Sequence, residues 1–428
     1  MKRTINVADL SRVEGEGALE LIIQDGQVAK AHFRIFESPR FFEAFLQGRR
    51  AAEAPDLTAR ICGICPVAYQ MSATHAIESV LGLSLPTPLR NLRRLLYCGE
   101  WLESHALHIY FLHAPDFLGY PSGLAMARDY PETVKAGLAI KKVGNELVAL
   151  IGGREIHPVN VRLGGFYRTP TAAELQALVP SLERALTLAR QTVKWTASFT
   201  FPEISYEYEY VALRHPQAYP LCEGRLVSNQ GLDITASEFE DFIGEEHVRH
   251  SNALQGYLKE RGAYLVGPLA RFALNYDRLT PLARQAAQEV GLTPECRNPF
   301  QSIIVRSIEL VLACEEALQL IASYERPEQP YLSAPWRAGQ GCAITEAPRG
   351  ILYHRYTIDD QGIIQEARIV PPTSQNQKTI EADLCRVAEQ HLHLDDARLT
   401  HILEQAIRNY DPCISCATHY LRLQVVRQ

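Results

Sequence analysis

Two C-x-x-C pairs near opposite ends of the chain constrain its fold more than any other feature. The first pair is Cys62 and Cys65, and the second is Cys413 and Cys416, in a chain of 428 residues. A C-x-x-C turn brings two thiolates within bonding distance of one metal ion, so two such turns can supply four sulfur ligands. If both pairs hold the same metal, the whole chain must close around one site. We therefore expect residues 1–428 to form a single integrated unit without independent domains.

The cysteine pattern alone favours a structural zinc site, which is closed and tetrahedral. Three features argue against zinc. The two pairs are separated by nearly the entire chain, whereas zinc ribbons are compact. Charged residues flank both pairs, Arg60 before the first and Asp411 before the second. A further candidate ligand, His419, lies just beyond Cys416. Soft thiolates also suit nickel and iron in redox sites, so the pattern leaves both kinds of metal open.

The remaining cysteines form no second cluster motif. Scattered single cysteines in a cytoplasmic protein are most often small buried apolar residues. Here they are Cys98, Cys222, Cys296, Cys314, Cys342 and Cys385. Any iron–sulfur cluster that serves this chain is therefore expected in a partner subunit.

Charge, hydropathy and the lack of certain motifs argue against several functions. The net charge of -6 and the lack of a dense Lys/Arg block argue against nucleic-acid binding. No apolar run approaches the roughly 18 residues that a membrane span needs. The N-terminal residues lack the apolar core of a secretory signal, so we expect a cytoplasmic protein. Neither a dinucleotide-binding nor a phosphate-binding glycine motif is present, so nucleotide chemistry would belong to another chain.

Hydrophobic periodicity predicts a mainly α fold with small β-hairpin elements (α+β) and a helical-bundle core. Helices are expected at residues 39–50, 71–81, 89–114, 133–152, 173–196, 236–260, 278–290, 299–325 and 395–409. Hairpins are expected at residues 17–35, around Asp25 and Gly26, and at residues 350–370. Residues 200–232 are aromatic-rich and irregular, with strand character.

The segments around both cysteine pairs closely resemble the two signature motifs of nickel–iron hydrogenase large subunits. These segments are RICGICP at residues 60–66 and DPCISCATH at residues 411–419. Further elements occur in the family's order: RVEG at 12–15, GGR with HP and GG within 152–165, EAPRG at 346–350 and PTSQN at 372–376. The resemblance implies the family's fold and reversible, heterolytic cleavage of H2 at a Ni–Fe centre. Its iron would carry CO and two cyanide ligands.

The resemblance also implies a role for each cysteine. Cys62 and Cys413 would be terminal nickel ligands, whereas Cys65 and Cys416 would bridge nickel to iron. Cys413 would accept the proton from H2 first, and Glu14 would relay it outward. A proton relay of this kind requires a carboxyl group whose pKa is raised by desolvation. Without the motif, Glu14 would be interpreted as a solvated turn residue.

Several other residues are expected around the centre by the same resemblance. Arg349 would lie over the iron and hydrogen-bond cyanide or polarise bound hydrogen, with Asp411 anchoring Arg349 or its loop. Thr373 could donate its hydroxyl to a cyanide. From the residues alone, Arg349 could instead form a surface ion pair and Thr373 a turn cap. The outer residues are Pro348, Ser104 and Tyr69. Many family members carry histidine at the position of Tyr69, and some carry aspartate at that of Ser104, so the surrounding hydrogen bonds differ here.

A magnesium-type ion is expected near the C-terminal motif. Glu43 and His419 would help to bind it, with a backbone carbonyl near Gln377 contributing. Magnesium prefers oxygen ligands and keeps several waters, so one carboxylate and one imidazole suffice. Glu43 could otherwise be an exposed helix residue.

Within the family, the chain most resembles the cytoplasmic, multi-subunit branch that reduces NAD(P). This implies a small subunit with iron–sulfur clusters, flavin- and NAD(P)-binding subunits, and maturation proteins. A C-terminal endopeptidase could remove residues 420–428. Other soluble acceptors remain open: ferredoxin, deazaflavin, sulfur or polysulfide. A complex-I-like quinone-module subunit resembles the fold but lacks the four cysteines that this chain retains.

Overall fold

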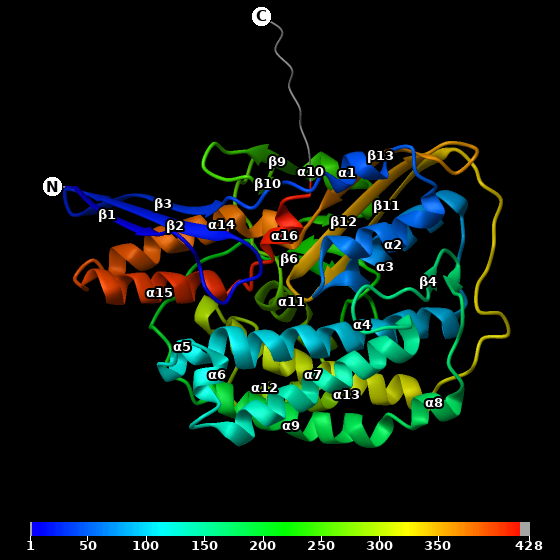
Figure 1. Cartoon of the computed structure of the whole chain (residues 1–428), viewed down its shortest axis with the longest axis horizontal. Helices are drawn as coiled ribbons and strands as arrows, with labels where there is room; N and C mark the ends of the chain where they lie inside the picture. Colours follow the sequence, from blue (N-terminus) through cyan, green and yellow to red (C-terminus); the bar gives the residue numbers. More distant parts are fainter. Residues whose placement is uncertain (1, 420–428) are drawn as a thin grey trace, which may run out of the picture.

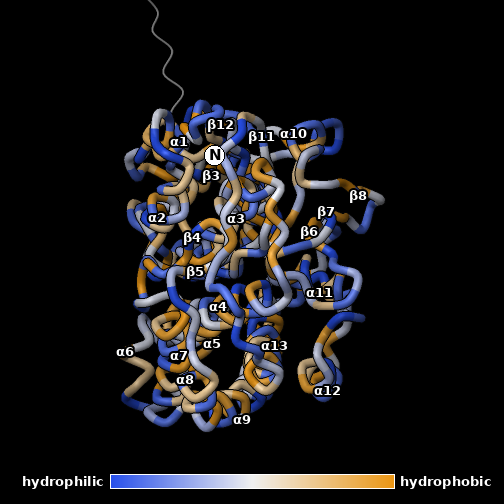
Figure 2. Tube along the Cα trace, turned by 90° about the vertical axis from the view of Figure 1, so that its right-hand side faces the viewer, coloured by the Kyte–Doolittle hydropathy of each residue, from blue (hydrophilic) through white to orange (hydrophobic). Residues whose placement is uncertain are grey.

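The computed structural model describes residues 2–419, and helices make up most of its regular structure. Small antiparallel sheets of two or three strands complete it, which confirms the predicted mainly α (α+β) class. Four long helices form one layer of the molecule: α4 (Thr87–Leu107), α7 (Pro131–Gly152), α9 (Val179–Ala197) and α13 (Ser302–Ala322) (Figure 1). Figure 2 shows the same division from the side, with the sheets above these helices.

The second layer contains both cysteine-bearing segments. Its two main sheets are three-stranded, with strands in sequence order. They comprise β1 (Lys2–Val7), β2 (Gly17–Gln24) and β3 (Gln27–Ile35), and β11 (Gly339–Ala347), β12 (Gly350–Ile358) and β13 (Ile364–Val370). Helix α3 (Pro66–Leu81) packs on β11 and β12, and α14 (Pro372–Gln390) packs on β3. Both predicted hairpins are confirmed, and each gains a third strand that the sequence analysis did not predict.

Shorter elements complete the fold. The remaining strands are β4 (Val161–Arg162), β5 (Gly165–Phe166), β6 (Val211–Arg214), β7 (Arg225–Ser228), β8 (Asp233–Ile234), β9 (Ile243–His247) and β10 (Leu254–Leu258). The remaining helices are α1 (Phe42–Leu46), α2 (Ala54–Thr58), α5 (Ala114–Leu118), α6 (Gly123–Met126), α8 (Ala172–Gln176), α10 (Phe239–Phe242), α11 (Pro268–Asn275), α12 (Pro281–Glu289), α15 (Asp396–Arg408) and α16 (Ile414–Ala417).

The predicted helix at residues 236–260 is wrong. A single 3-10 turn at Ala236–Glu238 and the short helix α10 form there, and β9 and β10 follow as an antiparallel hairpin. Leu254 and Leu258 are both buried, and their spacing fits one face of a helix or of a strand equally well. Packing against α14 favours the strand, because Gly256 lies close to the backbone of that helix. A Cβ on Gly256 would lie 2.8 Å from the Cα of Gln375.

Three other helix boundaries differ from the prediction. The helix expected at residues 39–50 shrinks to α1, because Phe41 adopts a left-handed φ of 55° just before it. The helix expected at residues 173–196 divides into α8 and α9, since Pro180 lacks the N–H that a continuous helix would use. The helix that was expected to end before Pro115 instead continues through a π-helical turn at His108–His113 into α5.

Helix α14 was missed by the sequence analysis. Its first turns carry polar residues that are nevertheless buried, so no apolar stripe marks them: Ser374, Gln375, Asn376 and Gln377. Among residues 2–419, none of the helices combines the length and apolarity that crossing a bilayer requires.

The crossing of α4 and α7 depends on two facing glycines. A Cβ on Gly144 would lie 2.6 Å from the carbonyl oxygen of Gly99 and 2.7 Å from the backbone nitrogen of Glu103. Those atoms belong to backbone, so they cannot move aside as a flexible side chain could. The two helices can approach this closely only because neither glycine has a side chain.

We predict that Gly144→Ala lowers the free energy of unfolding by about 1–2 kcal/mol. Overpacking costs about 1–3 kcal/mol, and contact with backbone that cannot move aside places this case in the upper part of that range. The roughly 1 kcal/mol that alanine gains in helix propensity offsets only part of the cost. Thermal unfolding of the purified protein measures the change. Leu138→Ala on the same helix is the control, because Leu138 is 51% exposed and should change stability by about 0.5 kcal/mol or less. Equal or higher stability of Gly144→Ala would contradict the close crossing.

Candidate metal centre

The four motif cysteines meet in one buried cluster. Their sulfur atoms all lie within 4.8 Å of one another. The Sγ atoms of Cys62 and Cys413 are 3.4 Å apart, and those of Cys65 and Cys416 are 3.7 Å apart. The Sγ atoms of Cys413 and Cys416 are 2.7 Å apart. The ends of the chain therefore converge on a site with four sulfur donors.

The first pair is shaped by the start of helix α3. Cys65 precedes the helix and Pro66 occupies its first turn, where a missing N–H costs nothing. The backbone N–H groups of Ile64 and Cys65 donate to the Sγ of Cys62, at 3.2 and 3.3 Å. Hydrogen bonds of this kind favour the thiolate form that binds metal.

Glu100 supports this turn and was not identified from the sequence. Its carboxylate, on α4, accepts the N–H groups of Val67 and Ala68 at 2.6 and 3.1 Å, at the first turn of α3. Burial raises its pKa well above the usual range, and nearby Glu103 adds to that effect. No local sequence signal marks Glu100, because its role arises only from this contact with a segment 33 residues away in sequence.

The second pair is held by residues from both ends of the chain. The hydroxyl oxygen of Thr373 accepts the N–H of Cys413 at 3.0 Å, and the carbonyl of Glu14 accepts the N–H of Ile414 at 2.9 Å. The carboxylate of Glu37 accepts a hydrogen bond from the hydroxyl of Ser415 at 2.7 Å. Glu37 was not among the residues predicted from the sequence. The N-terminal segment thus pairs with the C-terminal cysteine turn.

The Glu14 side chain touches the cysteine cluster. Its Oε2 lies 3.1 Å from the Sγ of Cys413 and accepts the N–H of Ser415 at 3.0 Å. Burial raises the pKa of Glu14, and the charge of Cys62 raises it further, against the hydrogen bonds from Ser415 and Cys413. The carboxyl group can therefore exchange a proton with the cluster at a pH nearer to neutrality than an exposed glutamate could.

Arg349 and Asp411 form a buried ion pair beside the cysteines. The Nε of Arg349 donates to the carbonyl of Asp411 at 2.7 Å and lies 3.1 Å from its Oδ2, while Nη2 donates to Oδ1 at 3.2 Å. Asp411 has a left-handed φ of 50°, which turns the chain into the cysteine motif. Nη1 of Arg349 is buried without a hydrogen-bond partner among residues 2–419.

The electrostatics of the thiols favour a bound cation. Burial raises the pKa of Cys413, whereas a hydrogen bond from Cys413 lowers the pKa of Cys62. Four adjacent thiolates in a buried site would repel one another strongly, so a metal must supply the compensating charge. Four soft sulfur donors fit nickel and iron, and they would also fit zinc.

The expected magnesium-site residues lie close to this cluster. Glu43 Oε1 is 3.8 Å from Nε2 of His419, and it accepts the N–H of Ile369 at 2.8 Å. The other ring nitrogen of His419 lies 2.5 Å from the carbonyl of Cys416. Burial lowers the pKa of His419 and favours the neutral imidazole that binds metals. The side chain of Gln377 donates to the carbonyl of Thr373 at 3.2 Å, within α14. That a backbone carbonyl near Gln377 contributes to the ion stays a prediction.

The outer residues are buried around the centre. Burial raises the pKa of Tyr69, and the charges of Cys416 and Cys65 add to this. Ser104 is fully buried on α4, and the carbonyl of Pro348 accepts a hydrogen bond from Arg271 at 2.8 Å. Residues 420–428, the expected cleavable tail, lie outside the described residues.

Comparisons with known proteins agree with the cluster. The family described as nickel-dependent hydrogenase matches residues 40–135 and 259–419, which include all four cysteines. Sulfhydrogenase 1 subunit alpha of Pyrococcus furiosus is 33% identical over 98% of this chain and 98% of its own length. The beta subunit of the NAD-reducing hydrogenase HoxS of Cupriavidus necator is 26% identical, over 98% of this chain and 96% of its own.

A solved structure extends the likeness to three dimensions. The crystal structure of an NAD+-reducing NiFe hydrogenase in the H2-reduced state superposes with a TM-score of 0.89 and 28% identity, over 97% of this chain and 99% of that one. The family match and the relatives that span nearly the whole chain confirm the resemblance of the motifs. This chain therefore belongs to the nickel-dependent hydrogenases, as the large subunit of a nickel–iron hydrogenase.

Proposed function

We propose that this chain cleaves H2 reversibly and heterolytically, and that its electrons pass through an iron–sulfur small subunit to NAD(P). The observation that carries the proposal is the buried cluster of four sulfurs within 4.8 Å, with carboxylate and guanidinium groups beside it. Cys62 and Cys413 are the proposed terminal nickel ligands, and Cys65 and Cys416 the proposed bridges. When bound, a Ni–Fe centre with CO and two cyanides on iron polarises H2 and accepts its electrons.

Cys413 and Glu14 provide the proposed proton path. The thiolate of Cys413 takes the proton, and Oε2 of Glu14, 3.1 Å away, receives it next. A base must lie within hydrogen-bond reach of the proton that it accepts, and this distance meets that condition. Burial raises the pKa of Glu14, which makes its carboxyl group a better proton acceptor than an exposed glutamate.

Arg349 and Thr373 are proposed to orient the ligands of the iron. Asp411 holds two of the three nitrogens of Arg349, which leaves Nη1 for a cyanide or bound hydrogen. The Thr373 oxygen accepts the N–H of Cys413, so its hydroxyl hydrogen remains available for donation to a cyanide. Glu43 and His419 are the proposed ligands of a magnesium-type ion that secures the C-terminal motif.

NAD(P) is the proposed acceptor because an NAD+-reducing hydrogenase matches nearly the whole chain with a TM-score of 0.89. Flavin- and NAD(P)-binding subunits, maturation proteins and a C-terminal endopeptidase are the proposed partners, and the cytoplasm is the proposed location. A sulfur or polysulfide acceptor is the second candidate, because the 33% identical relative is a sulfhydrogenase. Ferredoxin and deazaflavin remain further alternatives.

The acceptor can be tested with the purified multi-subunit complex under H2. We expect reduction of NAD+ or NADP+ to be faster than reduction of polysulfide, ferredoxin or a deazaflavin. Faster polysulfide reduction would favour the second candidate and contradict NAD(P) as the principal acceptor.

We predict that Cys413→Ala abolishes H2 uptake, lowering it by at least about 10³-fold, because it removes both a metal ligand and the first proton acceptor. H2-dependent reduction of an artificial dye by the complex measures this. Cys314→Ala is the matched control, because Cys314 is equally buried but lies on α13 among apolar residues. Full uptake by the Cys413 variant would contradict the proposed site.

We predict that Glu14→Gln lowers H2 uptake and hydrogen–deuterium exchange by about 10²–10⁴-fold while nickel content stays unchanged. The amide keeps the shape of the carboxyl group and can still accept from Ser415, but it cannot carry the proton. Glu37→Gln is the control. Glu37 also accepts a hydrogen bond from Ser415, but from its hydroxyl group, and Glu37 has no part in the proposed proton path. Exchange by Glu14→Gln at the rate of the unmodified complex would exclude Glu14 as the relay.

A further inference from the structure

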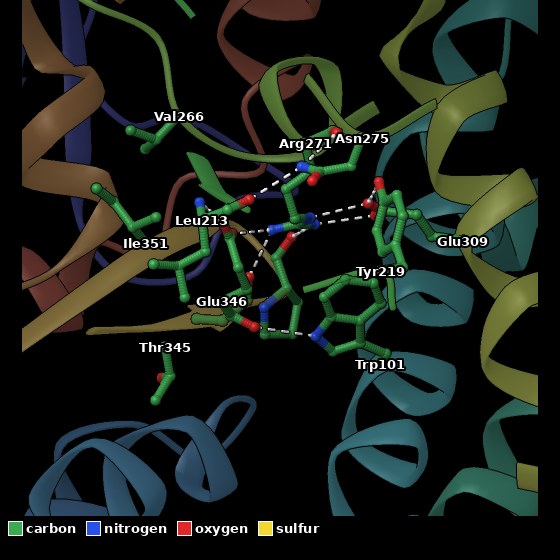
Figure 3. A network of polar contacts seen from close by, with 12 residues as sticks. Trp101, Leu213, Tyr219, Val266, Arg271, Asn275, Glu309, Thr345, Glu346 and Ile351 are labelled. Carbon is green, nitrogen blue, oxygen red and sulfur yellow. Dashed lines mark hydrogen bonds and ion pairs between the residues drawn. The ribbon is translucent and has the colours of Figure 1, made fainter. Parts of the chain in front are cut away.

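Arg271, on helix α11, is one of the most completely bonded side chains near the centre. It is fully buried, and Figure 3 shows it between Glu309 and Glu346. Its Nε and Nη2 donate to the two carboxylate oxygens of Glu309 at 2.8 and 2.9 Å. This bidentate geometry fixes the plane of the guanidinium group, which a lysine ammonium could not do.

The remaining donors of Arg271 hold the turn between β11 and β12. Nη1 donates to Oε2 of Glu346 at 3.0 Å and to the carbonyl of Ala347 at 2.8 Å. Nη2 also donates to the carbonyl of Pro348 at 2.8 Å. All five N–H groups are therefore used. The turn that they hold carries Arg349, the next residue along the chain.

The backbone of α11 touches the same turn. Gly267, which precedes the helix, has a φ of 107°, and a Cβ there would lie 2.6 Å from the carbonyl oxygen of Arg349. Gly350 has a φ of 136°, and a Cβ there would lie 2.6 Å from the side chain of Val266. The start of α11 and the turn are therefore in direct contact at both glycines, so the helix constrains the turn through its backbone as well as through Arg271.

Surrounding residues fix the partners of Arg271. Burial alone would raise the pKa of Glu309, but Arg271 outweighs it and lowers this pKa to about 2, so Glu309 carries the compensating charge. Tyr219 donates to Glu309 at 2.9 Å. Trp101 donates to the carbonyl of Glu346 at 3.2 Å, and its ring lies 4.4 Å from the guanidinium carbon (Figure 3).

We propose that Arg271 is a positioning residue for Arg349. By holding the carbonyls of Ala347 and Pro348, it fixes the origin of the Arg349 side chain, so that this side chain reaches both Asp411 and the ligands of the iron. The inference rests on the proposed function, because it assigns a purpose to the placement of Arg349. A displacement of about 1 Å in such a group can lower a rate by about 10²-fold.

The test compares Arg271→Lys with Arg93→Lys in the complete complex. Arg93 is the matched control: it is equally buried and binds Glu78 through two hydrogen bonds of 2.7 and 2.6 Å, but at the far end of α3 from the cysteines. Infrared spectra of the CO and cyanide stretches, nickel content, Tm, and kcat and KM for H2 are measured for both variants.

For Arg271→Lys we expect shifted cyanide bands and a kcat lower by about 10- to 10²-fold, with KM for H2 nearly unchanged. For Arg93→Lys we expect a lower Tm with bands at their unmodified positions. Wild-type bands and kcat in a nickel-loaded Arg271→Lys complex would overturn the inference. So would equal band shifts in both variants, because the effect would then be a general loss of packing.

If Arg271→Lys takes up no nickel, Trp101→Phe tests instead whether the contacts around Arg271 position Arg349. This variant leaves the arginine in place, removes the hydrogen bond to the carbonyl of Glu346 and reduces the ring that packs against the guanidinium group. A smaller shift of the same cyanide bands would support the inference, and unchanged bands would overturn it. An unmodified complex without any CO or cyanide band would instead refute the proposed function itself, so the two failures are distinguishable.

Discussion

The meeting of the two cysteine turns is the contact on which the rest of the structure depends. The sulfurs of Cys62 and Cys413 lie 3.4 Å apart although nearly the whole chain separates them in sequence. The first turn is placed by α3 on the β11–β13 sheet, and the second by α14 and by pairing with the N-terminal segment at Glu14. Contacts of such long sequence separation carry a large chain entropy cost, which the packing of both layers must offset.

The charges around the cluster follow from its burial. Four thiols in a space that excludes water cannot all ionise unless cations compensate them. Arg349 supplies one positive group on one side, and Asp411 keeps it oriented through contacts to both of its carboxylate oxygens. Glu14 lies against Cys413 with a raised pKa. The protein thus places a fixed cation and a protonatable acid at separate points of the same cluster, which suits a reaction that separates a proton from electrons.

The sequence was informative where a residue belongs to a short motif. Motif resemblance identified the four cysteines, and it singled out Glu14, Arg349 and Asp411, which the structure brings together. It could not identify Glu100, Arg271 or Glu309, because their importance arises only from contacts with distant segments. A buried carboxylate opposite a helix start has no local sequence signature.

Fold prediction failed where tertiary packing overrides local pattern. The apolar spacing of residues 236–260 fits a helix, yet packing against α14 makes this segment a hairpin. Helix α14 itself lacks an apolar stripe at its start, because buried amides such as Gln375 and Asn376 bond to the backbone of other segments there. Polar residues that serve long-range hydrogen bonds cannot be distinguished in sequence from solvated ones.

The most direct test of a Ni–Fe centre at the four cysteines is metal analysis combined with infrared spectroscopy of the purified, unmodified complex. We expect about one nickel per large subunit, together with stretching bands of one CO and two cyanides on iron. Zinc in place of nickel, with no CO or cyanide band, would contradict a Ni–Fe centre there.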